Sequence, residues 1–316
     1  MDGVTVPSDP LVTLCVPVFS ASAVVVETLT SIQAQTFENF RVSISVDAGG
    51  DDSAAACLPF TADKRFVISE QHSRLGWVDN CNWLISRVET PYFCIMPHDD
   101  LLEPDYLLRL IEAAKSYPEA AVIFSDLVSF GSMQNKLLTQ PSIVGCSFTR
   151  ATTFLIKHYN AVAFRGLVRT VVVAGNRLLD HNPFDDFAED TVWLLKLALQ
   201  GDLIRVPELL YRKRATKGGA RRQWPTRSND KERQFAAWEH HCFELAVLVL
   251  RSDFSAEQRK LLVRAIIRRL LNEGTNVGPL PPAESLLGAG EQDEYVKGFL
   301  SHLGDILGEE MVKALV

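Results

Sequence analysis

The chain has 316 residues, of which 47% are hydrophobic, so it can bury a substantial core and is not a disordered chain. This length exceeds one average domain, and we expect one large domain with an appendage. The net charge of −7 at pH 7 argues against a nucleic-acid-binding protein, which would need a basic surface.

Other bulk features indicate a reduced compartment. No apolar run approaches the ~20 residues that span a bilayer, and the first residues lack the basic and apolar regions of a signal peptide. The six cysteines are scattered without a CxxC pair, and four lie in apolar segments. Buried, reduced thiols fit this pattern better than disulfides or a zinc site. We therefore expect a cytoplasmic protein without a transmembrane segment.

Residues 11–130 alternate strand-like and helix-like segments. The strand-like segments are short apolar or alternating runs that end in turns, namely Leu11–Val18, Arg41–Asp47, Arg65–Ser69, Tyr92–Met96 and Ala120–Phe130. Between them, apolar residues recur at helical spacing after Val25 and after Gly76, and Pro104 suits the first turn of another helix. This alternation predicts an α/β domain with a mainly parallel sheet.

The second half continues with the helix-like Thr191–Leu199 and the strand-like Leu203–Arg212, and then changes in character. Thr216–Arg227 is a loop rich in Gly and Arg. The remaining segments have helical periodicity, with a linker before the last of them: Asp230–Asp253, Ala256–Asn272, the linker Gly274–Gly290, and Glu291–Val316. We predict a catalytic domain over residues 1–225 and a C-terminal helical region over residues 226–316.

Carboxylates gather where two predicted strands end. Asp47 follows one strand, and Asp99 and Asp100 follow another. Ligands of open α/β sheets bind beyond the carboxyl ends of the strands, and adjacent carboxylates stay ionised most easily near a cation. Oxygen ligands of this kind favour Mg²⁺ or Mn²⁺. The alternative from these residues alone is that Asp99 and Asp100 cap the helix near Pro104.

Several short motifs occur in a characteristic order. The first four are a strand with its turn (Val16–Ser20), a helix ending in QTF (Ser31–Phe40), a strand ending in Asp (Val46–Asp51), and a glycine-led helix with an asparagine (Gly76 and Asn82). The last three are an acidic turn (Met96–Pro104), an acidic pair (Glu189–Thr191), and a glycine followed by a Tyr-x-x-Arg strand (Gly201 with Tyr211–Arg214). In this order they resemble glycosyltransferase family 2, an inverting family with the GT-A fold. The resemblance covers residues 10–215.

The resemblance implies an enzyme of the hexosyltransferase type. It would move a sugar from a nucleotide-diphosphate donor, such as a UDP- or dTDP-sugar, to a saccharide or other hydroxyl acceptor in the synthesis of a surface polysaccharide or glycoconjugate. Its implied site comprises Asp190 as the general base, donor contacts from Pro17, Phe19, Asp47, Asn82, Asp99 and Arg214, and Mn²⁺ or Mg²⁺ held by Asp99 and Asp100. Glu189 would orient or tune Asp190.

Three positions depart from the family pattern. Pro97 stands where the first Asp of an Asp-x-Asp motif is usual, Ser20 replaces a frequent Asn, and Thr216 replaces a frequent His. The departure at Thr216 leaves phosphate contact to Arg212, Arg214 or the arginines at 221 and 222. The departure at Pro97 leaves open a catalytically inactive nucleotide-sugar-binding relative.

Two enzyme alternatives fit the sequence less well. A nicotinamide-dependent oxidoreductase needs a GxGxxG turn after the first strand, and Pro17–Ala23 contains no glycine. A nucleotidyltransferase on a similar sheet would have no need for Asp190 as a base.

Other polar residues have simpler explanations. We expect His98 to bond backbone in a turn rather than a metal, and Arg165 and Arg169 to be solvated rather than to contact an acidic acceptor. The basic amphipathic segment around Arg264 is compatible with peripheral contact to an anionic membrane, although packing on the catalytic domain is favoured. The sequence does not define the oligomeric state.

Overall fold

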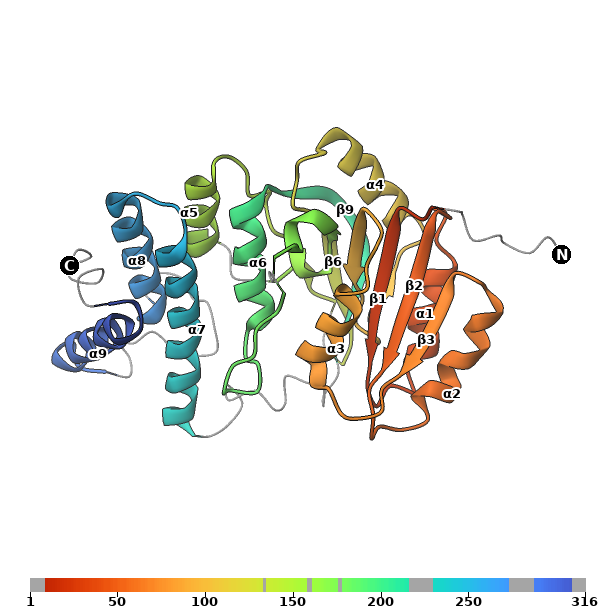
Figure 1. Cartoon of the computed structure of the whole chain (residues 1–316), viewed down its shortest axis with the longest axis horizontal. Helices are drawn as coiled ribbons and strands as arrows, with labels where there is room; N and C mark the ends of the chain where they lie inside the picture. Colours follow the sequence, from red (N-terminus) through yellow and green to blue (C-terminus); the bar gives the residue numbers. More distant parts are fainter. Residues whose placement is uncertain are drawn as a thin grey trace. The chain divides into compact units, whose positions relative to one another are not determined.

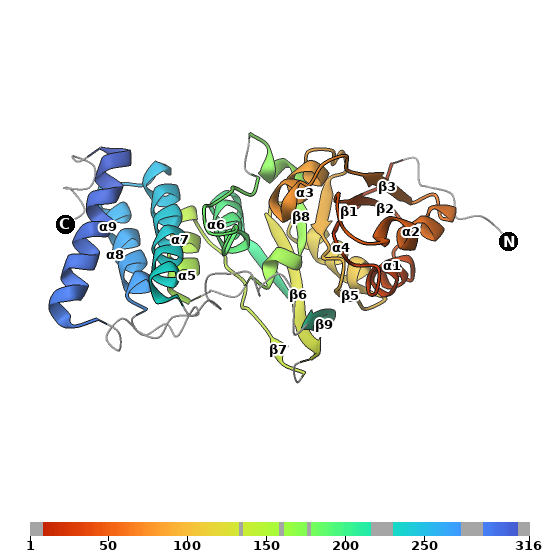
Figure 2. The same ribbon diagram turned by 90° about the horizontal axis from the view of Figure 1, so that it is seen from below.

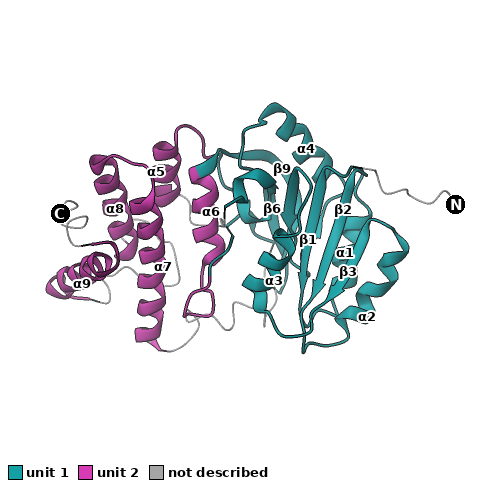
Figure 3. Cartoon of the chain, in the orientation of Figure 1, with its two compact units in different colours: residues 1–142, 161–180, 200–219 teal, residues 143–160, 181–199, 220–316 magenta. Residues whose placement is uncertain are grey.

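The structure is a computed structural model that describes residues 9–132, 135–157, 161–175, 178–215, 230–272 and 287–308. By its internal contacts the chain divides into two compact units, shown in Figure 3. The first unit comprises Met1–Ser142, Ala161–Asp180 and Gln200–Gly219, and the second comprises Ile143–Asn160, His181–Leu199 and Ala220–Val316. The predicted domain boundary at residue 225 lies outside the described residues, so the division into residues 1–225 and 226–316 stays a prediction.

The first unit is built on a mixed nine-stranded sheet with the order β3-β2-β1-β4-β8-β6-β9-β5, and β7 pairs with β6. The strands are β1 (Val12–Val18), β2 (Phe40–Val46), β3 (Phe66–Glu70), β4 (Tyr92–Ile95), β5 (Leu101–Leu102), β6 (Val122–Gly131), β7 (Leu137–Leu138), β8 (Leu167–Arg169) and β9 (Leu203–Ala215). The parallel pairs are β3-β2, β2-β1, β1-β4 and β6-β9. The short strands β5, β7 and β8 pair antiparallel.

Helices cover both faces of this sheet, which explains why β1 is buried along its length. Figures 1 and 2 show α1 (Val25–Gln33) and α2 (Ser53–Cys57) on one face and α3 (Gly76–Ile85) on the other. The helix α4 (Tyr106–Ser116) and three 3-10 turns, Leu58–Ala62, Ala163–Arg165 and Thr170–Val173, complete the unit. The predicted α/β fold with a mainly parallel sheet is confirmed.

One glycine is required by a close approach between two segments of this unit. A Cβ on Gly201 would lie 2.9 Å from the Ala121 nitrogen and 2.9 Å from the Glu119 oxygen. Only glycine therefore allows the chain entering β9 to run this close to the start of β6, which explains the family glycine at this position.

The second unit is helical. Its helices are α5 (Ser147–Lys157), α6 (Glu189–Gln200, its last residue in the first unit), α7 (Lys231–Arg251), α8 (Ala256–Leu270) and α9 (Ala289–Leu307). The predicted helices after residue 226 are confirmed over the described residues. Leu262 and Ile266 are buried where α8 packs on α5 and α7, whereas Arg264 is exposed. Within the described ranges, no helix is long and apolar enough to cross a bilayer.

Candidate active site

Asp47 lies directly after β2 and is almost completely buried. Its Oδ1 accepts hydrogen bonds from the backbone N–H groups of Ala48 (2.9 Å) and Leu75 (2.7 Å), and its Oδ2 accepts one from Gly76 (2.9 Å). Because α3 begins at Gly76, Asp47 satisfies N–H groups that the helix itself leaves without partners. The residue thus connects the end of β2 to the start of α3.

An arginine that the sequence analysis missed lies beside Asp47. The Arg74 Nε is 3.1 Å from Asp47 Oδ2, and the Arg74 guanidinium lies 3.1 Å from the centroid of the Phe19 ring. Half of the Arg74 side chain is exposed. The guanidinium therefore lies over the aromatic face of Phe19 while it forms an ion pair with the Asp47 carboxylate. No motif singled out Arg74, because a lone arginine in a loop has no distinguishing pattern.

The end of β1 is held close to the loop after β4. His98 Nδ1 lies 3.1 Å from the carbonyl oxygen of Pro17, and Thr28 donates to the His98 carbonyl at 2.8 Å. The expectation that His98 bonds backbone in a turn is confirmed. These contacts hold His98, the residue before Asp99, next to Pro17.

Asp100 is buried and bonded on both of its carboxylate oxygens. Oδ1 accepts from the backbone N–H of Arg214 at 2.7 Å. Oδ2 accepts from the Tyr211 hydroxyl at 2.8 Å and from Arg165 Nε at 3.0 Å. The Arg165 side chain is only 13% exposed, so the expectation that Arg165 is solvated is wrong. Arg169 instead pairs with the exposed Glu119.

Asp99 differs sharply from its neighbour. Its side chain is half-buried, and within the described part of the chain no hydrogen bond links its carboxylate to another residue. Burial, together with the negative charge of Asp100, raises the pKa of the Asp99 carboxyl above its usual value. A carboxylate in this state is stabilised by a cation. The described residues contain no group of three or more potential metal-ligating side chains.

Arg214, on β9, contacts the backbone of Asp99, the Glu27 carboxylate and the Phe130 ring. Its Nε donates to the carbonyl oxygen of Asp99 at 2.8 Å, and its terminal nitrogen pairs with Glu27 at 2.7 Å. Its guanidinium also lies 4.6 Å from the centroid of the Phe130 ring. The predicted donor residue is therefore next to Asp99. Glu27, which the sequence analysis missed, lies on α1 and forms the ion pair with Arg214.

Asn82 has a defined structural partner. Its side-chain amide donates to the carbonyl of Leu179 at 2.9 Å and accepts from the backbone N–H of Leu179 at 3.1 Å. This pair of bonds connects α3 to the end of the segment Ala161–Asp180 in the same unit. The predicted donor contact of Asn82 stays a prediction.

Asp190 lies in the first turn of α6, in the second unit, and is partly exposed. Among the described residues, its carboxylate accepts one long hydrogen bond, 3.4 Å from the Thr191 hydroxyl. Glu189 is completely buried and accepts from the Asn182 amide at 2.6 Å. Glu189 therefore anchors the chain before α6, and Asp190 follows it in the first turn of the helix.

The turn before α6 has an unusual backbone. Asp185, Asp186 and Ala188 have φ values of 56°, 54° and 59°, in the left-handed region that residues other than glycine rarely adopt. Each such residue costs about 1–3 kcal/mol and persists only where its surroundings enforce it. Asp186 accepts from the Asn182 N–H at 3.2 Å, which supplies part of this enforcement. Strained backbone of this kind clusters at functional sites.

Some predicted positions have no structural description. Thr216 and the arginines at 221 and 222, considered as alternative phosphate contacts, lie outside the described residues. Arg212 is described and is exposed on β9, with its guanidinium 4.9 Å from the centroid of the Phe130 ring.

Comparison with known proteins identifies the family. The family model described as glycosyl transferase family 2 matches residues 13–186, which is more than half of the chain. The chain belongs to glycosyl transferase family 2. This confirms the predicted family, its GT-A type fold and the prediction that the protein is a glycosyltransferase.

Curated relatives match parts of the chain. A glycosyltransferase from Haemophilus influenzae, itself uncharacterized, is 24% identical over 222 residues, which are 65% of this chain and 65% of the relative. The uncharacterized protein y4gI from Sinorhizobium fredii is 29% identical over 122 residues, which are 37% of this chain and 13% of the relative. The chain thus spans less than two thirds of the length of these relatives.

Solved structures share the fold at low identity. TarS 1–349 from S. aureus, in complex with UDP-GlcNAc, has a TM-score of 0.68 and 14% identity, covering 96% of this chain and 83% of TarS 1–349. The mannosyltransferase PcManGT from Pyrobaculum calidifontis, in complex with GDP-Man and Mn²⁺, has a TM-score of 0.53 and 14% identity, covering 99% and 88%. Such similarity supports a shared GT-A fold for this family 2 member.

Proposed function

We propose that this family 2 protein is an inverting glycosyltransferase that uses a UDP- or dTDP-sugar, a hydroxyl acceptor and Mn²⁺ or Mg²⁺. The observation that carries the proposal is the state of Asp99, a half-buried carboxylate without a hydrogen bond to another described residue, next to Asp100, whose two carboxylate oxygens both accept hydrogen bonds. Asp99 follows β4 and Asp47 follows β2, on the two sides of β1. Ligands of open α/β sheets bind beyond such strand ends, which supports the proposal.

The base of the donor would bind at Phe19 and Asp47. A carboxylate offers about four lone-pair positions, and in Asp47 backbone N–H groups take three of them, while Arg74 forms an ion pair beside the fourth. A pyrimidine ring that stacks on Phe19 would donate its imide N–H to the position that Arg74 now uses. Arg74 would then move aside or contact the edge of the base. This arrangement favours uracil or thymine, each of which has one such N–H.

A divalent cation fits the chemistry of the acidic turn. Mg²⁺ and Mn²⁺ are commonly held by one or two carboxylates together with substrate phosphates and water. Asp99 would be the main protein ligand, because both oxygens of Asp100 already accept bonds from Arg214, Tyr211 and Arg165. When bound, the ion would neutralise the diphosphate that leaves the sugar. Arg214 would support the same charge from β9.

Asp190 would act as the general base. The acceptor hydroxyl oxygen would form a bond to the anomeric carbon on the face opposite the diphosphate, and the carbon–oxygen bond to the diphosphate would break. Asp190 would take the hydroxyl proton, and the electron pair would leave with the diphosphate. Its carboxylate accepts only one long hydrogen bond from the residues that the structure describes, which supports this role because a base must keep a free lone pair. The buried Glu189 would position the turn that carries it.

The acceptor and the place of action are proposals of the same kind. We expect a saccharide or another hydroxyl compound used in surface polysaccharide or glycoconjugate synthesis, and a cytoplasmic location.

Thermal denaturation with a panel of nucleoside diphosphates, with and without Mn²⁺, tests the proposed donor. UDP or dTDP should raise the melting temperature only with Mn²⁺, and Phe19→Ala should weaken their binding about five- to 150-fold through loss of base stacking. Leu58→Ala, which removes an exposed apolar side chain elsewhere, is the matched control. Preference for GDP over UDP and dTDP would contradict the proposed base.

A further inference from the structure

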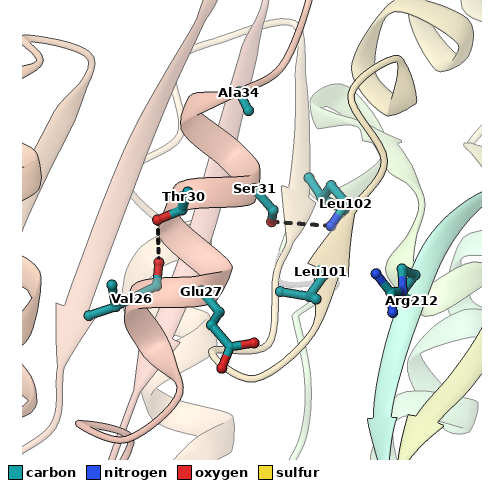
Figure 4. A pocket seen from close by; sticks show the side chains of 8 residues that line it. All are labelled: Val26, Glu27, Thr30, Ser31, Ala34, Leu101, Leu102 and Arg212. Carbon is teal, nitrogen blue, oxygen red and sulfur yellow. Dashed lines mark hydrogen bonds between the residues drawn. The ribbon is translucent and has the colours of Figure 1, made fainter.

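A groove runs along α1, next to Arg214 but apart from the proposed sites for the base and the metal. Its volume is about 380 Å³, within the range of small-molecule sites. The face of α1 forms one wall, while β5 and β9 form the other, as Figure 4 shows. Its lining residues are Val26, Glu27, Thr30, Ser31, Ala34, Leu101, Leu102 and Arg212.

The walls of the groove offer hydrocarbon rather than free hydrogen-bonding groups. Thr30 already donates its hydroxyl to the Val26 carbonyl at 2.7 Å. Ser31 donates to the Thr28 carbonyl at 2.7 Å and accepts from the Leu102 N–H at 3.2 Å, as the dashed line in Figure 4 marks. A sugar ring in the groove would leave most of its hydroxyls unpaired, and the lining contains no aromatic ring to stack on it. The lining therefore fits an alkyl chain better than a carbohydrate.

The two charged residues of the groove are not equivalent. Glu27 already pairs with Arg214 at 2.7 Å, so its charge is compensated. Arg212 stacks on Phe130, at 4.9 Å from the ring centroid, and no ion pair joins it to any acidic residue that the structure describes. Stacking fixes the guanidinium while its in-plane N–H groups stay available to an anion. Within the described part of the chain, the groove thus combines an apolar floor with one cation that no ion pair compensates.

We infer that this groove binds an anionic amphiphile, an alkyl phosphate, whose chain lies over Val26, Ala34 and Leu101 and whose phosphate pairs with Arg212. The inference does not depend on the proposed function, because these residues lie outside the proposed sites for the base and the metal. Glu27 nevertheless connects the groove to the donor site, since the same carboxylate holds Arg214.

Isothermal titration calorimetry with decyl phosphate, below its micelle concentration and without nucleotide, tests the inference on the full chain. Decyl phosphate should bind at one site, whereas decanol and inorganic phosphate should each bind at least tenfold more weakly. Inorganic phosphate that binds as tightly as decyl phosphate would overturn the inference, because the apolar lining would then contribute nothing. Absence of decyl phosphate binding would also overturn it. Neither result would affect UDP binding, which tests the donor proposal separately.

Two substitutions locate the site. Arg212→Gln should weaken decyl phosphate binding about ten- to a hundredfold, because a charge-assisted hydrogen bond is lost. Val26→Asp should also weaken it at least tenfold by placing a negative charge on the apolar wall. The matched controls are Arg87→Gln, an arginine stacked on Trp83, and Val67→Asp, an exposed valine on β3; both should bind like the parent. Unchanged affinity in both groove variants would exclude this groove as the site.

Discussion

The backbone N–H of Arg214 donates a 2.7 Å hydrogen bond to Oδ1 of Asp100, which ties the end of β9 to the turn after β4. The Tyr211 hydroxyl, three residues earlier on β9, donates to the other oxygen of the same carboxylate. Asp100 therefore stabilises the arrangement of two strands, while Asp99 beside it keeps its carboxylate available. Two adjacent carboxylates thus have separable roles.

Asp100→Asn should lower the free energy of unfolding by about 3–5 kcal/mol, because it removes the charge that pairs with the mostly buried Arg165. Chemical denaturation followed by circular dichroism measures this change. A loss below about 1 kcal/mol would show that Asp100 does not hold β9 to the acidic turn.

Asp99→Asn should behave in the opposite way. The raised pKa of Asp99 means that the folded protein binds this proton more tightly than the unfolded chain does. The protonated carboxyl therefore stabilises the folded state at low pH, and this contribution is lost as the pH rises through the raised pKa. Removing this carboxylate should therefore leave stability at pH 7 unchanged or increased. UDP affinity should fall in the presence of Mn²⁺ and stay unchanged with EDTA. Parent protein that binds UDP equally well with Mn²⁺ and with EDTA would contradict the metal site.

The sequence predicted the parallel strands because each is an apolar run bounded by turns, and it predicted the residues that end them. It did not predict β5, β7 and β8, since strands of two or three residues have no periodicity. Nor could it predict that Asp100 is bonded and Asp99 is not. That difference arises because Tyr211, Arg165 and Arg214 are distant in sequence and converge only when β8 and β9 join the sheet.

Arg74 and Glu27 illustrate the same limit within the site. Each is a single charged residue in a segment recognised for other features, and its role depends on a partner far along the chain. Asp47 could be predicted as a site residue, but its bonds to Leu75 and Gly76 could not. These bonds matter for experiments, because the residue supports the start of α3 in addition to its proposed contact with the base.

Asp47→Ala should therefore have two effects. It should weaken UDP binding about ten- to a hundredfold through loss of a charge-assisted hydrogen bond. It should also reduce stability by about 1–3 kcal/mol, because N–H groups at the start of α3 lose their partner. Calorimetry and chemical denaturation measure the two effects, and Asp52→Ala is the control, since Asp52 is exposed and makes no capping bond. Parent-like UDP affinity in Asp47→Ala would remove this residue from the donor site.

The central claim is that Asp190, the second residue of α6, is the base of a sugar transfer and does more than stabilise the helix through its charge. A carboxylate in the first turn of a helix is favoured by the helix dipole. A purely electrostatic role therefore predicts that Asp190→Asn costs at most about 1 kcal/mol of stability and leaves transfer intact. The general-base role also predicts normal folding and donor binding, but it requires a lone pair that Asn cannot use to accept the proton.

The most direct measurement is the rate of sugar transfer by Asp190→Asn under saturating donor and Mn²⁺, compared with the parent and with Asp253→Asn, an exposed aspartate after α7. Melting temperature and UDP affinity are measured on the same preparations to exclude misfolding. We predict near-parental stability and donor affinity, with transfer reduced about 10²–10⁴-fold in Asp190→Asn alone. Transfer at the parental rate by Asp190→Asn would contradict the general-base role.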